Sequence, residues 1–183
     1  HPVNRRQRQM CIRDRSITDS DAQAVVVARK IRLIAPDDAR LEAVSTVKAL
    51  QSIGCKRFYY KYCATFDSTT DGNIGPIAEA MLETLNTKKT VFCPAFPEYT
   101  VTIFQGRMFL GSTPLGDSFK QNDPVTPMTN SNLVEVLQSQ TSKHVGLISH
   151  SMLIKEVESV RSHINKMSST PFFITCLLYT SPS

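Results

Sequence analysis

Residues 59–76 of this chain, YYKYCATFDSTTDGNIGP, combine a cation, short oxygen-bearing side chains and a glycine-containing turn. Lys61 supplies the cation, and Asp67 and Ser68 supply compact acceptors and donors. The turn that contains Asn73 and Gly75 opens a predicted helix, and backbone N–H groups at a helix start are able to bind a negative group. These residues predict a site for an anionic ligand.

Each of these residues also has a structural interpretation. Lys61 fits a solvated strand end, but its place directly ahead of the Asp-Ser loop favours function, because ligands bind where parallel strands end. Asp67 and Ser68 fit a turn or a helix cap equally well, so both interpretations stay open. Asn73 and Gly75 suit a tight turn whatever it binds, which favours a conformational role.

Strand-like apolar runs alternate with amphipathic helical runs along the chain, a pattern typical of parallel α/β units. Residues 23–28, QAVVVA, contain a continuous β-branched run, which predicts a strand covered on both faces. Further strands are predicted at residues 57–62, 90–93, 145–148 and 172–175. Helices are predicted between Pro36 and Gly54, over 76–85, after residue 131 and through 154–164.

Residues 99–104 and 107–110 flank Gln105 and Gly106, which predicts a β-hairpin. The proline-rich segment 111–129 is long for a simple connection and is therefore a candidate functional loop. Asn130 or Ser131 is expected to cap the next helix. The predicted fold is a three-layer α/β domain with a mostly parallel sheet, flanking helices and a small β-hairpin insertion.

The two ends of the chain resemble translated sequencing-adapter DNA more than natural protein. We expect residues 1–15 and 176–183 to be non-native and residues 16–175 to be a partial domain. Five arginines and one aspartate in residues 1–15 contribute +4 of the net charge of +5. The remainder is nearly neutral, which argues against nucleic-acid binding.

No apolar run approaches the length needed to span a bilayer, and no secretory signal precedes the first predicted strand. We therefore expect a cytoplasmic protein that does not bind membranes. Cys55, Cys63 and Cys93 lack the spacing of metal ligands, so neither a metal site nor a disulfide is expected.

Four blocks, KYCATFDSTTDGNIGP, VFCPAFPE, FQGRMFLG and DPVTPMTNSNLVEVLQSQT, together resemble the four-carbon acid sugar kinases. The resemblance covers nearly all of residues 22–148. It implies ATP-dependent phosphorylation of a terminal hydroxyl of a short sugar acid, the 4-hydroxyl of 3-oxo-tetronate for the most similar group. It also implies two α/β domains, an acid-sugar-binding domain to which this chain corresponds and a nucleotide-binding domain that holds ATP and Mg²⁺.

The resemblance implies roles for individual residues. Lys61 and Arg32 are candidates for the substrate carboxylate, with Lys30 and Arg32 in a Lys-x-Arg block, although a surface role fits Arg32 equally well. A loop that closes over the substrate would include Thr126 and Met128, whose alternative role is a turn ahead of a helix. The expected substrate-binding residues are Arg32, Lys61, Asp67, Ser68, Asn73, Thr126 and Met128.

No catalytic residue is expected in this chain. The resemblance places the base in an acidic turn that precedes Ala22, so the fold is expected to be truncated at its N-terminal strand and the fragment alone to be inactive. Tyr99-Thr100-Val101 replaces the family's Asn-Gly-Arg, and Asp123 replaces a histidine. These departures leave open a vestigial acid-sugar-binding protein or a kinase for threonate or erythronate. A homo-oligomer is also left open.

Overall fold

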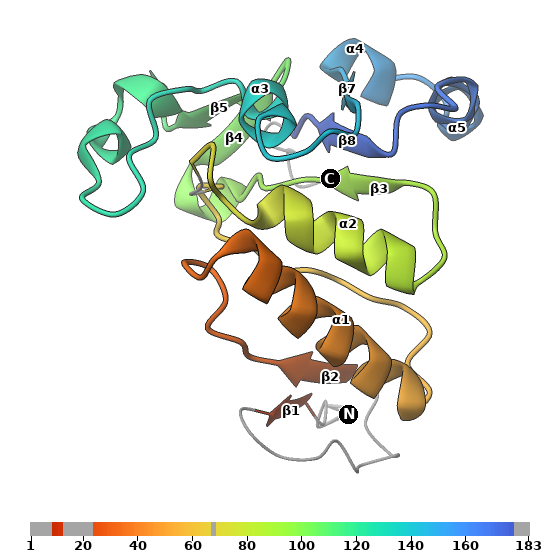
Figure 1. Cartoon of the computed structure of the whole chain (residues 1–183). Helices are drawn as coiled ribbons and strands as arrows, with labels where there is room; N and C mark the ends of the chain where they lie inside the picture. The colour runs from red at the N-terminus through yellow and green to blue at the C-terminus, as the bar shows by residue number, and fades with distance from the viewer. Residues whose placement is uncertain (1–8, 13–23, 67–68, 178–183) are drawn as a thin grey trace, which may run out of the picture.

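The computed structural model describes residues 9–12, as backbone, together with residues 24–66 and 69–177 (Figure 1). Two parallel sheets and one antiparallel sheet form among these residues. Strands β1 (Gln9–Ile12) and β2 (Ala24–Val27) pair in parallel. Strands β3 (Thr90–Phe92), β8 (Phe172–Thr175) and β7 (Val145–Ile148) form a parallel sheet with β8 in the middle.

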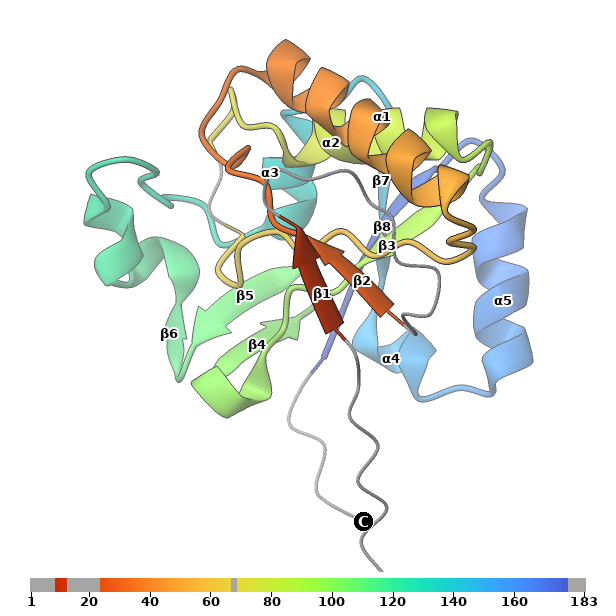
Figure 2. The ribbon, with the colours of Figure 1, turned by 90° about the horizontal axis from the view of Figure 1, so that it is seen from below.

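The antiparallel sheet contains β4 (Val101–Phe104), β5 (Arg107–Leu110) and β6 (Thr113–Pro114). The helices are α1 (Pro36–Ser52), α2 (Ile74–Thr84), α3 (Leu133–Gln138), α4 (His150–Leu153) and α5 (Val157–Lys166). The prediction of an α/β fold with mainly parallel pairing and a hairpin is therefore confirmed. Figure 2 shows the antiparallel sheet to one side of the parallel strands.

Residues 57–62 do not form the predicted strand. A strand requires a neighbour with which to exchange backbone hydrogen bonds, and this segment crosses between β2 and β3, which belong to separate sheets (Figures 1 and 2). Two of its tyrosines pack against the core instead, and burial raises the pKa of both Tyr60 and Tyr62 well above the usual range. Tyr59, between them and Phe58, is 83% exposed. The apolar pattern wrongly indicated ladder pairing.

The prediction that both faces of residues 23–28 are covered is also wrong. Residues 24–27 alternate between exposed and half-buried, and Val26 keeps 38% of its surface exposed. The described partner of β2 is β1 alone, and a two-stranded sheet buries less side-chain surface than a wider one.

Helices α1 and α2 pack against each other through small side chains. Ala39 and Ala43 of α1 are buried against Ile77 and Ala80 of α2. Small residues allow close helix approach, which accounts for this packing. Pro36 occupies the first turn of α1 and Gly54, at φ +86°, follows its end, both as predicted.

The main core lies between α2, α3, the β3–β8–β7 sheet and the hairpin. Phe66, Phe92 and Phe172 are almost completely buried in it. The Phe66 and Phe92 ring centroids are 6.2 Å apart, and those of Phe92 and Phe172 are 5.6 Å apart, both in edge-to-face geometry. Aromatic pairs in this geometry add to the stabilisation from burial.

Asn132, rather than Asn130 or Ser131, caps α3. Its Oδ1 accepts a hydrogen bond of 3.2 Å from the backbone N–H of Val134, and its Nδ2 donates to Glu135. Asn130 is involved one step earlier, because its Oδ1 accepts from the N–H of Asn132 at 2.8 Å. The hairpin turn is as predicted, with Gln105 and Gly106 both at positive φ.

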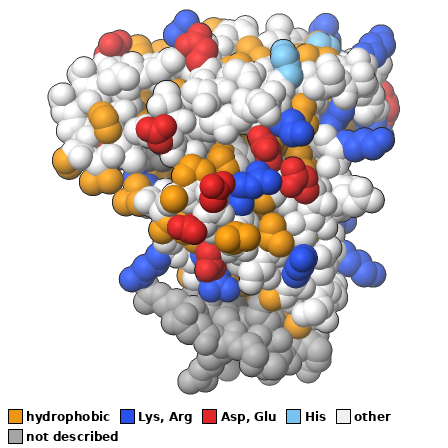
Figure 3. All heavy atoms as spheres, viewed as in Figure 1, with side chains coloured by type: hydrophobic (Ala, Val, Ile, Leu, Met, Phe, Trp, Pro, Cys, Tyr) orange, Lys and Arg blue, Asp and Glu red, His pale blue; other side chains and the backbone are white. Residues whose placement is uncertain are grey.

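Acidic and basic side chains lie beside one another on the face shown in Figure 3. Arg40 of α1 lies 3.5 Å from Glu79 and 3.1 Å from Glu83 of α2. Such mixing gives this face no concentrated basic surface of the kind that binds a phosphate backbone. No helix among the described residues combines the length and apolar character needed to cross a lipid bilayer.

Lys89 joins the start of β3 to the end of α5. Its Nζ donates to the carbonyl oxygens of Ile164 and, at 2.9 Å, Met167, and it lies 5.7 Å from the Phe173 ring centre. We expect Lys89→Met to lower the free energy of unfolding by about 1–2 kcal/mol, because carbonyls at the helix end lose a cationic donor. Urea denaturation would measure this loss. The exposed neighbour provides the control: an equal loss in Lys88→Met would contradict the assignment.

Candidate functional site

Asn73 ties the start of α2 to the segment that follows β2. Its side chain is buried, and its Nδ2 donates to the carbonyl oxygens of Ile31 at 2.6 Å and Ile34 at 3.0 Å. Both amide hydrogens are therefore used within the protein. Asn73 holds Arg32, which lies between these two carbonyls in the chain, at a fixed place beside α2.

Arg32 and Thr126 meet across 94 residues of sequence. The Arg32 Nη2 donates to the Thr126 Oγ1 at 3.4 Å, which is near the upper limit for a hydrogen bond. Arg32 is exposed, whereas Thr126 keeps only 6% of its surface exposed. The structure thus brings two of the predicted site residues together, one from each side of the candidate site.

Asp123 organises the loop that carries Thr126. Its Oδ1 accepts hydrogen bonds from the backbone N–H groups of Thr126 at 2.9 Å and Val125 at 3.0 Å. Its Oδ2 lies 3.2 Å from Lys120 Nζ. These donors, first the Thr126 N–H, then the Val125 N–H and Lys120, lower the pKa of Asp123 to about 2. The carboxylate is therefore ionised at neutral pH and directed toward the loop's own donors.

Met128 belongs to the core. Its side chain is 1% exposed and lies in the same cluster as Phe66 and Leu115. Its backbone N–H donates to the carbonyl oxygen of Lys120 at 2.9 Å, which closes the loop behind Asp123. We interpret Met128 as a residue that holds the loop rather than one that contacts a ligand.

Gly116 allows the beginning of the same loop to approach its end. A Cβ at this position would lie 2.6 Å from the carbonyl oxygen of Thr129. The Gly116 N–H also donates to the Ser131 Oγ at 2.8 Å. The loop predicted to be functional is thus fixed at both ends.

The structure describes Lys61 but not the two residues of the Asp-Ser loop. The Lys61 side chain is exposed, and its Nζ donates to the carbonyl oxygen of the adjacent Tyr62 at 2.7 Å. This contact does not connect Lys61 to Arg32 or Thr126, so its participation in the site stays a prediction. Asp67 and Ser68 lie outside the described residues.

The backbone N–H of Gly75 does not point at a ligand, contrary to the prediction. It donates to the Gln140 Oε1 at 3.0 Å, while the Gln140 Nε2 donates to the carbonyl oxygen of Thr69 at 2.9 Å. Gln140 therefore fastens the 69–75 turn from just beyond α3. Local sequence carries no signal for this residue, because it lies 65 residues away from Gly75 in the chain.

The site supplies donors for an acid. Arg32 offers a guanidinium with a planar set of N–H donors suited to a carboxylate, and Thr126 offers a hydroxyl able to donate or accept. Among the described residues of the loop, Asp123 is the carboxylate nearest to Thr126, and its two oxygens already accept three hydrogen bonds. This arrangement is able to hold an anion.

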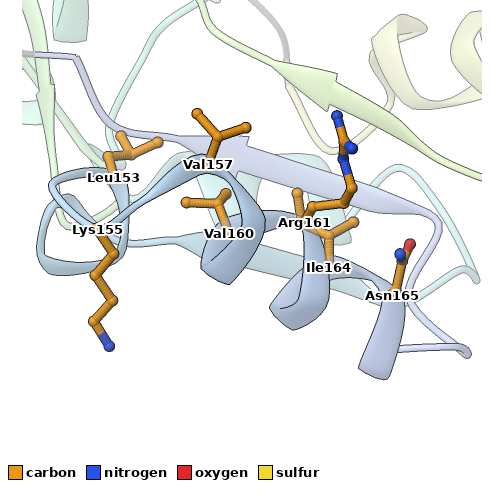
Figure 4. A pocket seen from close by; sticks show the side chains of 7 residues that line it. All are labelled: Leu153, Lys155, Val157, Val160, Arg161, Ile164 and Asn165. Atoms are coloured by element: carbon orange, nitrogen blue, oxygen red, sulfur yellow. The ribbon is translucent and has the colours of Figure 1, made fainter.

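Two cavities lie away from these residues. One of about 380 Å³ is lined by residues of α4, α5 and their connection, including Leu153, Val157, Val160 and Ile164 (Figure 4). A second of about 320 Å³ is lined by residues that include Glu83, Lys88 and Lys143. Neither of the two is lined by a predicted site residue.

A protein-family model described as the sugar-binding N-terminal domain matches residues 5–175. Among curated proteins, the 3-oxo-tetronate kinase of Pseudomonas fluorescens is 47% identical over 147 residues, which cover 80% of this chain and 34% of that protein. The chain therefore spans about a third of the length of the curated relatives it matches.

Solved structures share the fold. A crystal structure of a Haemophilus influenzae protein superposes with a TM-score of 0.87 at 33% identity, covering 93% of this chain and 42% of that one. A Bordetella bronchiseptica structure, a citrate-bound domain-swapped dimer, superposes with a TM-score of 0.67 at 22% identity, covering 86% of this chain and 36% of that one. At that identity the second likeness concerns the fold alone.

Proposed function

The chain belongs to the family of sugar-binding N-terminal domains, and from this membership we propose that it binds a four-carbon sugar acid between Arg32 and the 123–128 loop. The contact between Arg32 and Thr126 carries the proposal, because it joins two segments distant in sequence at one edge of the fold. We retain Lys61, together with Asp67 and Ser68, as proposed ligands.

The chemistry of the site matches a sugar acid. A carboxylate would take the guanidinium of Arg32 as a charged donor, a bond worth about 1.5–3 kcal/mol. A hydroxyl on the neighbouring carbon would exchange a hydrogen bond with Thr126 Oγ1, whose buried position fixes its direction. Asn73 would act indirectly by holding the backbone on either side of Arg32.

We further propose that a polypeptide of the relatives' length is an ATP-dependent kinase of a four-carbon acid such as 3-oxo-tetronate. The names and identities of the curated relatives support this proposal. Phosphoryl transfer depends on positioning and charge stabilisation by Mg²⁺. This chain spans about a third of the relatives' length, and we assign ATP and Mg²⁺ to the part of such a polypeptide outside this match.

A separate proposal concerns the two ends of the chain. We propose that residues 1–15 and 176–183 are not native to the domain, although the family match begins at residue 5 and ends at residue 175. Sequencing the source gene on both sides would test this, and the same letters recovered in frame from genomic DNA would contradict it.

Isothermal titration calorimetry with erythronate, threonate and 3-oxo-tetronate tests acid binding. We expect saturable binding of at least one acid and none of erythritol, which has the same carbon chain without a carboxylate. Absence of binding by every acid would contradict the proposal and favour a vestigial protein. An ATP-coupled assay addresses catalysis: we expect this chain alone to form no ADP, and turnover by it would refute the assignment of the nucleotide site to another region.

A further inference from the structure

We propose that Asp123, supported by Lys120, is a positioning residue that builds the Thr126 side of the sugar-acid site; this inference rests on the proposed function. Asp123 replaces a histidine of the family that the chain resembles, and an aspartate beside an acid site would be expected to repel the ligand. In the structure, this carboxylate instead holds the turn that contains Thr126.

The turn depends on acceptors that the Asp123 side chain provides. Thr126 is buried, and a backbone N–H group that is withdrawn from water needs a partner. The N–H groups of Val125 and Thr126 both donate to Asp123 Oδ1, at 3.0 and 2.9 Å. An Asp followed by Pro124 favours this type of turn, because the side chain mimics a backbone acceptor. Without it, the two N–H groups have no acceptor in the loop.

Lys120 completes the arrangement from the other side. Its Nζ lies 3.2 Å from Asp123 Oδ2, and both side chains are mostly buried, at 17% and 21% exposure. The carbonyl oxygen of Lys120 also accepts from the Met128 N–H at 2.9 Å. The two residues thus hold the 120–128 loop closed, and Lys120 balances the negative charge of Asp123 next to the proposed acid site.

The effect reaches the ligand through Thr126. The Arg32–Thr126 hydrogen bond is already long at 3.4 Å, so a small displacement of the turn would break it. Arg32 would then lose its hydrogen bond to Thr126. The expected consequence is weaker binding of the acid without loss of the fold, because Asp123 lies on a loop outside the main core.

Two substitutions distinguish the role of the Asp123 oxygen as a hydrogen-bond acceptor from the role of its negative charge. Asp123→Ala removes both, and we expect it to weaken erythronate binding about 5- to 10-fold. Asp123→Asn keeps an oxygen acceptor for the two N–H groups, and we expect it to bind within about 2-fold of the natural chain. Asp117→Ala, at an exposed position of the same loop, provides the matched control and should leave affinity unchanged.

Calorimetry with erythronate and amide hydrogen exchange at residues 125 and 126 form the test. Support requires weaker binding and faster exchange in Asp123→Ala, with both restored in Asp123→Asn. Equal affinity in Asp123→Ala and the natural chain would overturn the proposal, as would an Asn variant as weak as the Ala variant. If the natural chain binds no acid, the proposed function fails, and unchanged exchange in Asp123→Ala would separately overturn the role of Asp123 in the turn.

Discussion

Replacing Arg32 by alanine is expected to weaken erythronate binding about 10- to 100-fold, equivalent to about 1.5–3 kcal/mol. The substitution removes the guanidinium that donates a hydrogen bond to Thr126, where the segment after β2 meets the 123–128 loop. Arg32 is exposed, so the folded state should lose little stability and the effect should fall on binding. Calorimetric titration of the variant would measure the loss.

Arg29 provides a matched control in the same segment. It is also an arginine, but it lies 3.6 Å from Glu42 of α1 in a solvent-exposed ion pair, and such pairs contribute little. Arg29→Ala should therefore bind erythronate within about 2-fold of the natural chain. Equal losses in the two variants would mean that general surface charge, rather than the Arg32 position, attracts the acid.

Phe66→Ala is expected to lower the free energy of unfolding by about 3–5 kcal/mol. Phe66 is fully buried and contacts both Tyr62 and Phe92, with ring centroids 5.2 and 6.2 Å away. Its backbone has φ +54°, an unfavourable conformation for a large side chain, which burial of the ring offsets. Urea denaturation followed by circular dichroism would measure the loss.

Phe119→Ala is the corresponding control, because this phenylalanine is 76% exposed in the 111–129 loop. We expect its free energy of unfolding to change by less than about 0.5 kcal/mol. A Phe66 variant as stable as the Phe119 variant would show that the ring does not anchor the chain between residues 57–62 and the turn at 69–75.

The fold was predictable where the apolar pattern and the pairing agree. The strands β3, β7 and β8 pair in one parallel sheet, and α1 begins at Pro36 as its sequence indicates. Residues 57–62 show the limit of the pattern. Tyr60 and Tyr62 are partly buried against the core, yet strand formation also depends on a neighbouring strand, which a local window of sequence does not contain.

The geometry among the predicted site residues was only partly predictable from the sequence. Arg32 and Thr126 were each chosen by resemblance, and their contact arises from the fold. Gln140 fastens the 69–75 turn through contacts that no spacing rule reveals. The turn at Asp123 was predictable, because Asp-Pro favours a turn. The replacement of a histidine by Asp123 indicated a change of charge, but it did not indicate that the carboxylate accepts hydrogen bonds from backbone N–H groups.

The most direct test of the central claim is a two-dimensional amide NMR titration of this chain with erythronate. The proposed site predicts that the largest saturable shifts occur at residues 31–34 and 123–128, with little change along α5. Shifts concentrated at Val157, Val160 and Ile164, which line the 380 Å³ cavity, would contradict it by placing the ligand elsewhere. A spectrum unchanged at saturating erythronate and threonate would contradict acid binding altogether.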